Sequence, residues 1–187
     1  MKINLFEPHI DKSEERAVLD VLRRKFWASG SGIGKVKEFE NKFKVYLNSN
    51  EIIAVNSGTA ALNLAISLLD IKDKEVIIPS LSFVSTANCV LQNGGIPIFA
   101  DVEHNTLCLD PERVEELITK KTKAIIPVHF GGMSCKLDQF LKLSKDYKLK
   151  IIEDAAHAAG TRFNKKMIGS QSFAVCFSFH PVKNLAM

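Results

Sequence analysis

A single lysine, Lys183, follows an apolar run in the segment 174–187, AVCFSFHPVKNLAM. Residues 175–179 are β-branched, aromatic or small, which predicts a buried strand, and Pro181 then ends the ladder. A lysine held at the mouth of a sheet is favoured in its neutral form, because burial can lower a lysine pKa by ~3 units or more. The neutral amine is the nucleophile that forms a Schiff base with an aldehyde. The alternative is a solvated surface lysine, which is the usual fate of this residue type.

A run of small and hydroxyl-bearing residues, NSGTAAL at 56–62, follows the apolar stretch 52–55 and opens a helical pattern. Small residues at a helix N-terminus let backbone N–H groups approach an anion, and the hydroxyls of Ser57 or Thr59 can add hydrogen bonds. The run is therefore a candidate phosphate cradle, and equally an ordinary helix N-cap. Ser178 is a second candidate for binding phosphate, or else an outward-facing polar residue of an alternating strand.

Two polar residues and one aromatic residue complete the candidate chemistry. Asp154 follows the apolar run 150–153, and His157 lies one helical turn further on. A carboxylate at the end of a strand can pair with a pyridinium nitrogen, which makes a pyridoxal ring an electron sink. Taken separately, Asp154 as a helix cap and His157 as a core histidine are the simpler interpretations. Phe83 follows another apolar run and can either lie flat against a planar ring or fill the core.

The elements that must position these residues alternate along the chain. Five further apolar runs predict strands, at 52–55, 75–78, 96–100, 124–128 and 150–153. Helical patterns or shorter helix-like segments separate most of them. This alternation predicts an α/β fold, a three-layer sandwich in which helices cover both faces of a mostly parallel sheet. Ligands of such sheets bind at the carboxyl ends of the strands, which is where the candidate residues lie.

Three helices carry their own signals. The segment 11–26 has Asp11 or Ser13 as N-cap and an apolar stripe formed by Ala17, Val18, Leu22 and Phe26. The segment 35–47 places on one face Val36, Phe39, Phe43 and Tyr46. The segment 111–118 begins with Asp110 as N-cap and Pro111 at the first helical position.

The composition excludes several classes of protein. With 187 residues, 46% of them hydrophobic and 25% charged, the chain matches an ordinary soluble globular domain. Its net charge of +4 is small and dispersed, so we expect no nucleic-acid partner. The cysteines form no CxxC pair and no zinc-type spacing, which favours reduced thiols and no metal site. The N-terminal segment lacks an apolar run of signal-peptide or membrane-helix length, so we expect a cytoplasmic protein without membrane contact.

The motifs, taken in order, resemble those of the DegT/DnrJ/EryC1/StrS sugar aminotransferases, which are pyridoxal-phosphate enzymes with the aspartate-aminotransferase type of fold. The resemblance covers nearly the whole chain. The matching segments are GKVKEFENKF, AVNSGTAALNLA, IIPSLSFVSTANCV, IPIFADV, IIPVHFGG, IIEDAAHAAGT and FSFHPVKNL. The most specific signal is EDAAHA followed at the expected distance by SFHPVKN.

The resemblance implies pyridoxal 5′-phosphate as cofactor and a role for each candidate residue. Lys183 would be the Schiff-base lysine and the proton shuttle of transamination. Asp154 would pair with the pyridine nitrogen, and His157, a position that the family fills with glutamine or histidine, would lie near the ring oxygen. The remaining cofactor-binding residues would be Gly58, Thr59 and Ser178 at the phosphate and Phe83 against the ring. A dehydrating side branch of the family has histidine in place of the lysine, so the lysine favours transamination.

The resemblance also implies the partners. The acceptor would be a keto sugar, nucleotide-linked, the donor an amino acid such as glutamate, and the assembly a homodimer serving amino-sugar or polysaccharide biosynthesis. Family members continue beyond the lysine, so residues 1–187 are expected to be the N-terminal portion of the large domain, without its remainder and the small C-terminal domain. The alternative is a catalytically inactive fragment that acts as a binding or assembly module. A nicotinamide enzyme is disfavoured, because GSGIG at 30–34 does not match GxGxxG.

Overall fold

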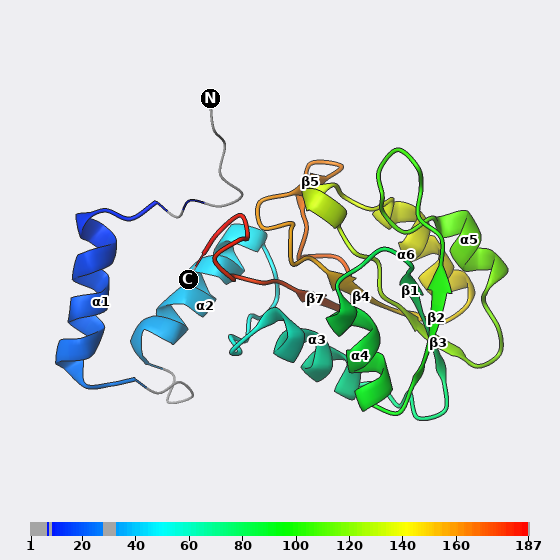
Figure 1. Ribbon diagram of the computed structural model, residues 1–187, viewed down its shortest axis with the longest axis horizontal. Coiled ribbons are helices and arrows are strands. Elements are labelled where there is room, and N and C mark those ends of the chain that lie inside the picture. Colours follow the sequence, from blue (N-terminus) through cyan, green and yellow to red (C-terminus); the bar gives the residue numbers. More distant parts are fainter. Residues whose placement is uncertain (1–6, 8, 28–32, 187) are drawn as a thin grey trace.

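The computed structural model describes residues 7, 9–27 and 33–186, and its centre is a five-stranded parallel sheet (Figure 1). The strand order is β2-β1-β3-β4-β7, and every neighbouring pair is parallel. The strands are β1 Glu75–Pro79, β2 Ile96–Ala100, β3 Thr122–Ile125, β4 Lys150–Asp154 and β7 Ala174–Cys176. A separate antiparallel hairpin joins β5 Arg162–Phe163 to β6 Lys166–Met167. The predicted α/β fold is confirmed.

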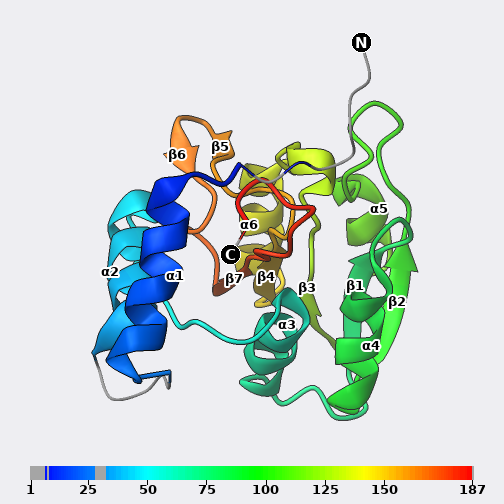
Figure 2. The ribbon, with the colours of Figure 1, turned by 60° about the vertical axis from the view of Figure 1, so that its left-hand side comes forward.

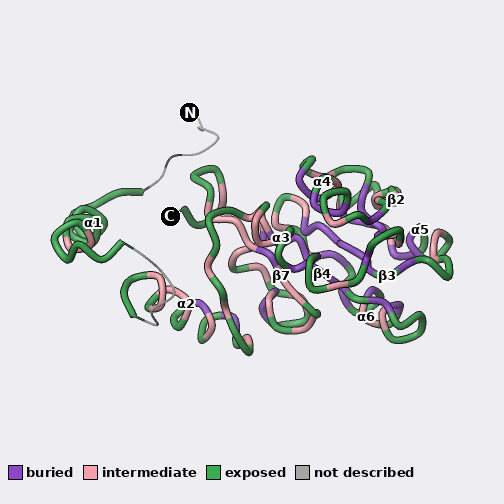
Figure 3. The backbone as a smooth tube through the Cα atoms, turned by 90° about the horizontal axis from the view of Figure 1, so that it is seen from below, coloured by how far each residue is buried: buried purple, intermediate pink, exposed green. Residues whose placement is uncertain are grey.

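Helices cover both faces of the sheet. The α-helices are α1 Lys12–Arg24, α2 Gly34–Leu47, α3 Gly58–Ser67, α4 Val84–Gln92, α5 Pro111–Glu116 and α6 Leu137–Asp146, and a 3-10 helix, η1, spans Phe130–Gly132. Side chains of α3 and α4 pack with Val76 and Ile152 on one face, whereas α5 and α6 pack with Ile77 and Ile151 on the other. Adjacent strand residues thus point to opposite faces. The buried strands run between these helix layers in Figure 3.

The N-terminal helices differ in how they pack. α2 buries Phe43 and Leu47 against Met167 of the hairpin. α1 begins after Asp11, whose carboxylate forms a capping box with Glu14, and it lies away from the sheet (Figure 1). No residue of α1 is buried in the described part of the chain, and its predicted apolar stripe remains largely exposed.

Three predicted strands need correction, and one predicted segment cannot be compared. The strand predicted at 124–128 is β3, Thr122–Ile125, and Val128 beyond it forms only an isolated bridge with Asp154. Residues 52–55 do not form a strand: the backbone N–H of Ala54 donates to Oε1 of Glu40, 3.0 Å away, so a side chain replaces a ladder partner. The last predicted strand ends at Cys176, and the residues after it turn toward α2, where Phe177 and Phe179 contact Phe43. Residues 30–32 of the GSGIG segment lie outside the described residues, and its last residue, Gly34, opens α2.

The start of α5 confirms a further local prediction. The side chain of Asp110 accepts from the backbone N–H of Glu112 and Pro111 opens α5, although this helix ends at Glu116. All four cysteines are buried, and none forms a disulfide bond. Within residues 7, 9–27 and 33–186, no helix is long and apolar enough to cross a membrane.

Candidate functional site

The candidate residues gather where the strands end. Asp154 is the last residue of β4 and pairs in register with Cys176, the last residue of the neighbouring β7. Ser178 lies two residues beyond that pair. Phe83 follows β1, and Gly58 at the N-terminus of α3 lies close to Phe177 and Ser178, just beyond β7. Figure 2 shows the C-terminal segment, in red, looping over this part of the molecule. The topology therefore brings residues from distant parts of the sequence to one edge.

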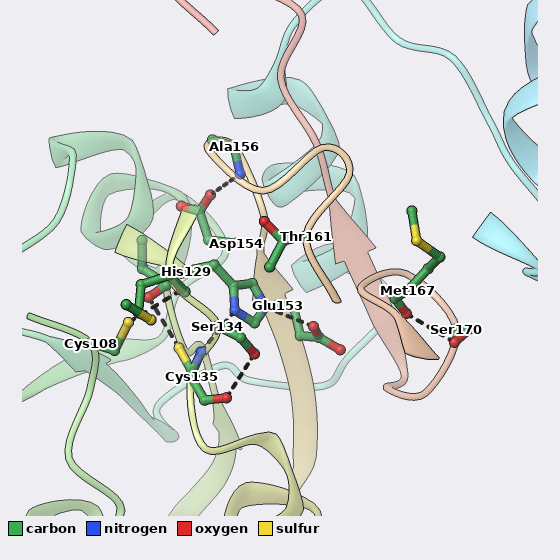
Figure 4. A network of polar contacts seen from close by, with 12 residues as sticks. Cys108, His129, Ser134, Cys135, Glu153, Asp154, Ala156, Thr161, Met167 and Ser170 are labelled. Atoms are coloured by element: carbon green, nitrogen blue, oxygen red, sulfur yellow. Dashed lines mark hydrogen bonds and ion pairs between the residues drawn. The ribbon is translucent and has the colours of Figure 1, made fainter. Parts of the chain in front are cut away.

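The carboxylate of Asp154 is buried, with 4% of the residue exposed. The backbone N–H of Ala156 donates to Oδ1 at 3.2 Å, and the hydroxyl of Thr86 donates to Oδ2 at 3.0 Å (Figure 4 shows the former). Burial raises the pKa of Asp154, and these two hydrogen bonds oppose the rise. A buried carboxylate with a raised pKa is stabilised by a cationic partner. The site thus favours a positively charged or N–H-bearing group beside Asp154.

A buried pair of side chains, those of His129 and Glu153, lies next to Asp154. Nε2 of His129 is 2.8 Å from Oε2 of Glu153, and both residues are 0% exposed. Nδ1 of His129 accepts from the backbone N–H of Cys135 at 3.1 Å, so the ring proton must reside on Nε2 and be donated to Glu153. The backbone N–H of His129 donates to the carbonyl of Asp154 at 3.1 Å. The pair therefore fixes the strand segment that carries Asp154 (Figure 4).

The N-terminus of α3 touches the end of β7. Ser57 is the N-cap, and its hydroxyl accepts from the backbone N–H of Ala60 at 3.1 Å, which confirms the N-cap interpretation. A Cβ placed on Gly58 would lie 3.0 Å from Cβ of Ser178 and 3.2 Å from the carbonyl oxygen of Phe177. Only glycine permits this approach without displacement. The first amides of a helix have no intrahelical acceptor, so an anion-binding role for this turn is compatible with the N-cap.

The remaining phosphate candidate is Thr59, the second residue of α3. It is exposed, and its carbonyl accepts from the thiol of Cys89 at 3.5 Å. Thr59 lies at the same helix end as Gly58. Ser178 is half-buried, and its hydroxyl accepts from the backbone N–H of His180 at 3.4 Å.

His157 lies within the electrostatic influence of Lys183. Nδ1 of His157 accepts from the backbone N–H of Gly131 at 3.2 Å. Burial lowers the pKa of His157, the positive charge of Lys183 lowers it further, and Asp154 opposes both effects. Lys183 is half-buried, and its backbone N–H donates to the carbonyl of His180 at 2.8 Å, which closes a turn after Pro181. The three predicted residues therefore share one electrostatic environment.

Phe83 does not fill the core. The residue is 72% exposed and precedes the first residue of α4. Its carbonyl accepts from the backbone N–H of Thr86 at 3.1 Å. The core alternative for this residue is thus wrong, and the ring is free to contact a ligand.

Four residues of this site were not singled out from the sequence: Ser82, Thr86, His129 and Glu153. Each makes a side-chain contact around Asp154 or beside it. The available signals were weak, because a threonine one turn after Phe83 and a histidine in a run of apolar residues are both common in cores. Their partners become apparent only from the strand order.

The chain matches one family of known proteins, and it covers about half the length of the relatives described below. The model of the DegT/DnrJ/EryC1/StrS aminotransferase family matches residues 8–187. The chain is 43% identical over 180 residues to the spore coat polysaccharide biosynthesis protein SpsC of Bacillus subtilis. The matched segment covers 96% of this chain and 46% of SpsC.

Solved structures give the same result. PseC of Helicobacter pylori, described as an aminotransferase involved in the biosynthesis of pseudoaminic acid, superposes with a TM-score of 0.91 at 32% identity, over 100% of this chain and 50% of that one. The sugar aminotransferase Spr1654 of Streptococcus pneumoniae, described as putative and solved in its PLP form, superposes with a TM-score of 0.91 at 30% identity, over 100% and 51%. The chain thus spans about half the length of these relatives.

Proposed function

Because this chain belongs to the DegT/DnrJ/EryC1/StrS aminotransferase family, we propose that it forms the N-terminal portion of the large domain of a pyridoxal-phosphate-dependent aminotransferase acting on a keto sugar. The observation that carries the proposal is the buried carboxylate of Asp154 at the end of β4, with His157, whose pKa the charge of Lys183 lowers, three residues further along the chain. Spr1654, a neighbour solved in its PLP form, supports the cofactor.

The surroundings of Asp154 fit a protonated pyridine nitrogen. Each carboxylate oxygen accepts one hydrogen bond from the protein and has a further lone pair to offer. An N–H⁺ group on the ring would offset the cost of burying the charge, which is the cause of the raised pKa. Asp154 would thereby hold the ring nitrogen in its protonated form.

The turn at the start of α3 fits the phosphate. Gly58, in the first turn of α3, lies close to the side chain of Ser178. Helix N-termini favour anions because their amides are unpaired and their dipole is positive. Gly58, Thr59 and Ser178 would hold the phosphate, and the exposed ring of Phe83 would stack on the face of the pyridine.

Pyridoxal phosphate, when bound, supplies an electron sink that stabilises negative charge at the carbon next to the transferred nitrogen. Lys183 would bond to the aldehyde carbon through Nζ. In each half-reaction the same amine would take up and return the proton at the reacting carbon. Because Nδ1 of His157 accepts from Gly131, the neutral ring carries its proton on Nε2, which would be donated to the ring oxygen.

The substrates follow from the relatives. SpsC is described as a polysaccharide biosynthesis protein and PseC as an aminotransferase of pseudoaminic acid biosynthesis. These descriptions support an acceptor of the sugar class, and we propose that it is a nucleotide-linked keto sugar aminated by an amino acid donor such as glutamate. We infer a homodimer in the cytoplasm as the working form of the whole protein.

Peptide mapping tests the proposal. Purified full-length protein is incubated with pyridoxal phosphate, reduced with borohydride and digested for mass spectrometry. We expect stoichiometric label on Lys183, which the variant Lys183→Ala loses and the exposed control Lys142→Ala retains. Scattered label, or none, would contradict the cofactor site and favour the inactive-fragment alternative.

A further inference from the structure

We propose that Thr86 is a positioning residue for the cofactor ring, acting through Asp154, an inference that rests on the proposed function. Thr86 is 0% exposed and lies in the first turn of α4. Its hydroxyl contacts Oδ2 of Asp154 at 3.0 Å and Oγ of Ser82 at 2.8 Å. The three side chains form a continuous chain of hydrogen bonds that leads from a partly buried serine to a buried carboxylate.

The direction of these hydrogen bonds follows from chemistry. An ionised carboxylate can only accept, so Thr86 must donate its single hydroxyl proton to Asp154. Thr86 then has only its lone pairs to offer Ser82, so Ser82 must donate to Thr86. Hydrogen bonds to a charged group are stronger than those between neutral groups. The hydrogen bonds from Ser82 to Thr86 and from Thr86 to Asp154 therefore both point toward the carboxylate, and they favour the ionised form of Asp154.

Strand alternation explains why α4 supplies this group. Ile152 packs on the face covered by α3 and α4, and Asp154, two residues on, points to that same face. Thr86 is 68 residues away in sequence but directly opposite in space. A threonine in a helix often bonds to the carbonyl one turn earlier. Here the hydroxyl bonds to Asp154, so it serves the site rather than its own helix.

Thr86 also links the two contacts expected at the ring. Its backbone N–H donates to the carbonyl of Phe83 at 3.1 Å, so one residue binds both the stacking position and the partner of the ring nitrogen. Its hydroxyl opposes the rise that burial causes in the pKa of Asp154. Both effects serve one end: an ionised carboxylate held at a defined place relative to the ring face.

A cofactor analogue isolates this role. In 1-deazapyridoxal 5′-phosphate a carbon replaces the ring nitrogen, so the analogue retains the aldehyde and phosphate but cannot pair with Asp154. The dissociation constants of both compounds are measured on the full-length apoprotein by fluorescence titration. In Thr86→Val, which keeps the shape and removes the hydroxyl, we expect the preference for the natural cofactor to fall about tenfold, as for the loss of one hydrogen bond to a charged group.

Matched variants separate positioning from packing. Thr86→Ser keeps the hydroxyl and should retain the preference within about twofold, and Ser82→Ala should lower it by less than Thr86→Val, because it removes only the outer bond. If Thr86→Val weakens the binding of both compounds equally, or leaves the preference unchanged, the role of Thr86 is overturned while the cofactor site stands. Equal binding of both compounds by the unmutated protein, without label on Lys183, would overturn the cofactor site and this inference together.

Discussion

His129 and Glu153 face each other in the interior, with Nε2 of the histidine 2.8 Å from Oε2 of the carboxyl group. Glu153 and Asp154 are consecutive, so strand alternation sends the two acidic side chains to opposite faces of the sheet. Asp154 lies on the face of the candidate site, and Glu153, on the opposite face, contacts His129. One strand end thus carries a binding group and its structural anchor.

This anchor predicts a stability effect. In His129→Leu the buried carboxyl group of Glu153 loses its partner, and we expect the free energy of unfolding to fall by about 3 kcal/mol. Urea denaturation measures the change. Glu153→Gln, which keeps an oxygen to accept from Nε2, should cost less than half as much. Equal losses in the two variants would show that the pair contributes packing alone.

Asp154→Asn should separate stability from activity. Burial raises the pKa of Asp154 in the folded apoprotein, so the folded state binds this proton more tightly than the unfolded state does. Stability from this group therefore falls as pH rises from the unfolded pKa through the raised folded pKa. We expect the asparagine variant to melt higher than the unmutated apoprotein at neutral pH and to lose that segment of the pH dependence, while transamination falls at least about a hundredfold. A lower melting temperature at neutral pH would contradict the assignment.

Gly58→Ala should weaken phosphate binding through a steric effect. The new methyl group would lie 3.0 Å from Cβ of Ser178, which forces the turn away from β7. Such overpacking costs about 1–3 kcal/mol, so we expect the dissociation constant of pyridoxal phosphate to rise by about tenfold or more. The double variant Gly58→Ala with Ser178→Gly relieves the contact with the serine Cβ but not the one with the carbonyl oxygen of Phe177, so it should regain part of the stability without regaining full affinity, because the serine hydroxyl is gone. Unchanged affinity in the single variant would remove this turn from the site.

His157 should act in its neutral form. Burial and the charge of Lys183 lower the pKa of His157, so its ring becomes protonated only at a lower pH than an ordinary histidine does. His157→Gln, which keeps a donor, should retain activity within about tenfold, whereas His157→Leu should lose about a hundredfold. The absorption spectrum of the bound cofactor provides a second measurement, since its ring oxygen is the expected partner. A spectrum that does not change in His157→Leu would place the histidine away from that oxygen.

The sequence predicts the sheet well and its supporting contacts poorly. Alternating apolar runs and the N-cap at Asp110 depend on neighbours in the chain, and these local signals are confirmed. The run at 52–55 looks the same as a strand, but its backbone bonds to Glu40, a competitor that no periodicity reveals. Local pattern therefore identifies the elements without deciding which of them pair.

The candidate site shows the same division. The sequence predicts Asp154 and Ser178 at strand ends, and the structure places Asp154 at the end of β4, in register with Cys176, and Ser178 two residues beyond β7. Thr86 and His129 were not expected, because they meet their partners across 68 and 24 residues. Such contacts follow from the spatial order of strands, in which β4 lies between β3 and β7 although β5 and β6 separate it from β7 in the chain.

The bond between Glu40 and Ala54 has a mechanical consequence. Residues 52–55 lead directly into the first turn of α3, yet it is α2 rather than a neighbouring strand that holds them there. A tether to a helix side chain can lengthen or rotate at little cost, whereas a slip in a strand ladder breaks several bonds at once. The segment that leads to Gly58 can therefore shift more easily than the strand β4, which ends at Asp154.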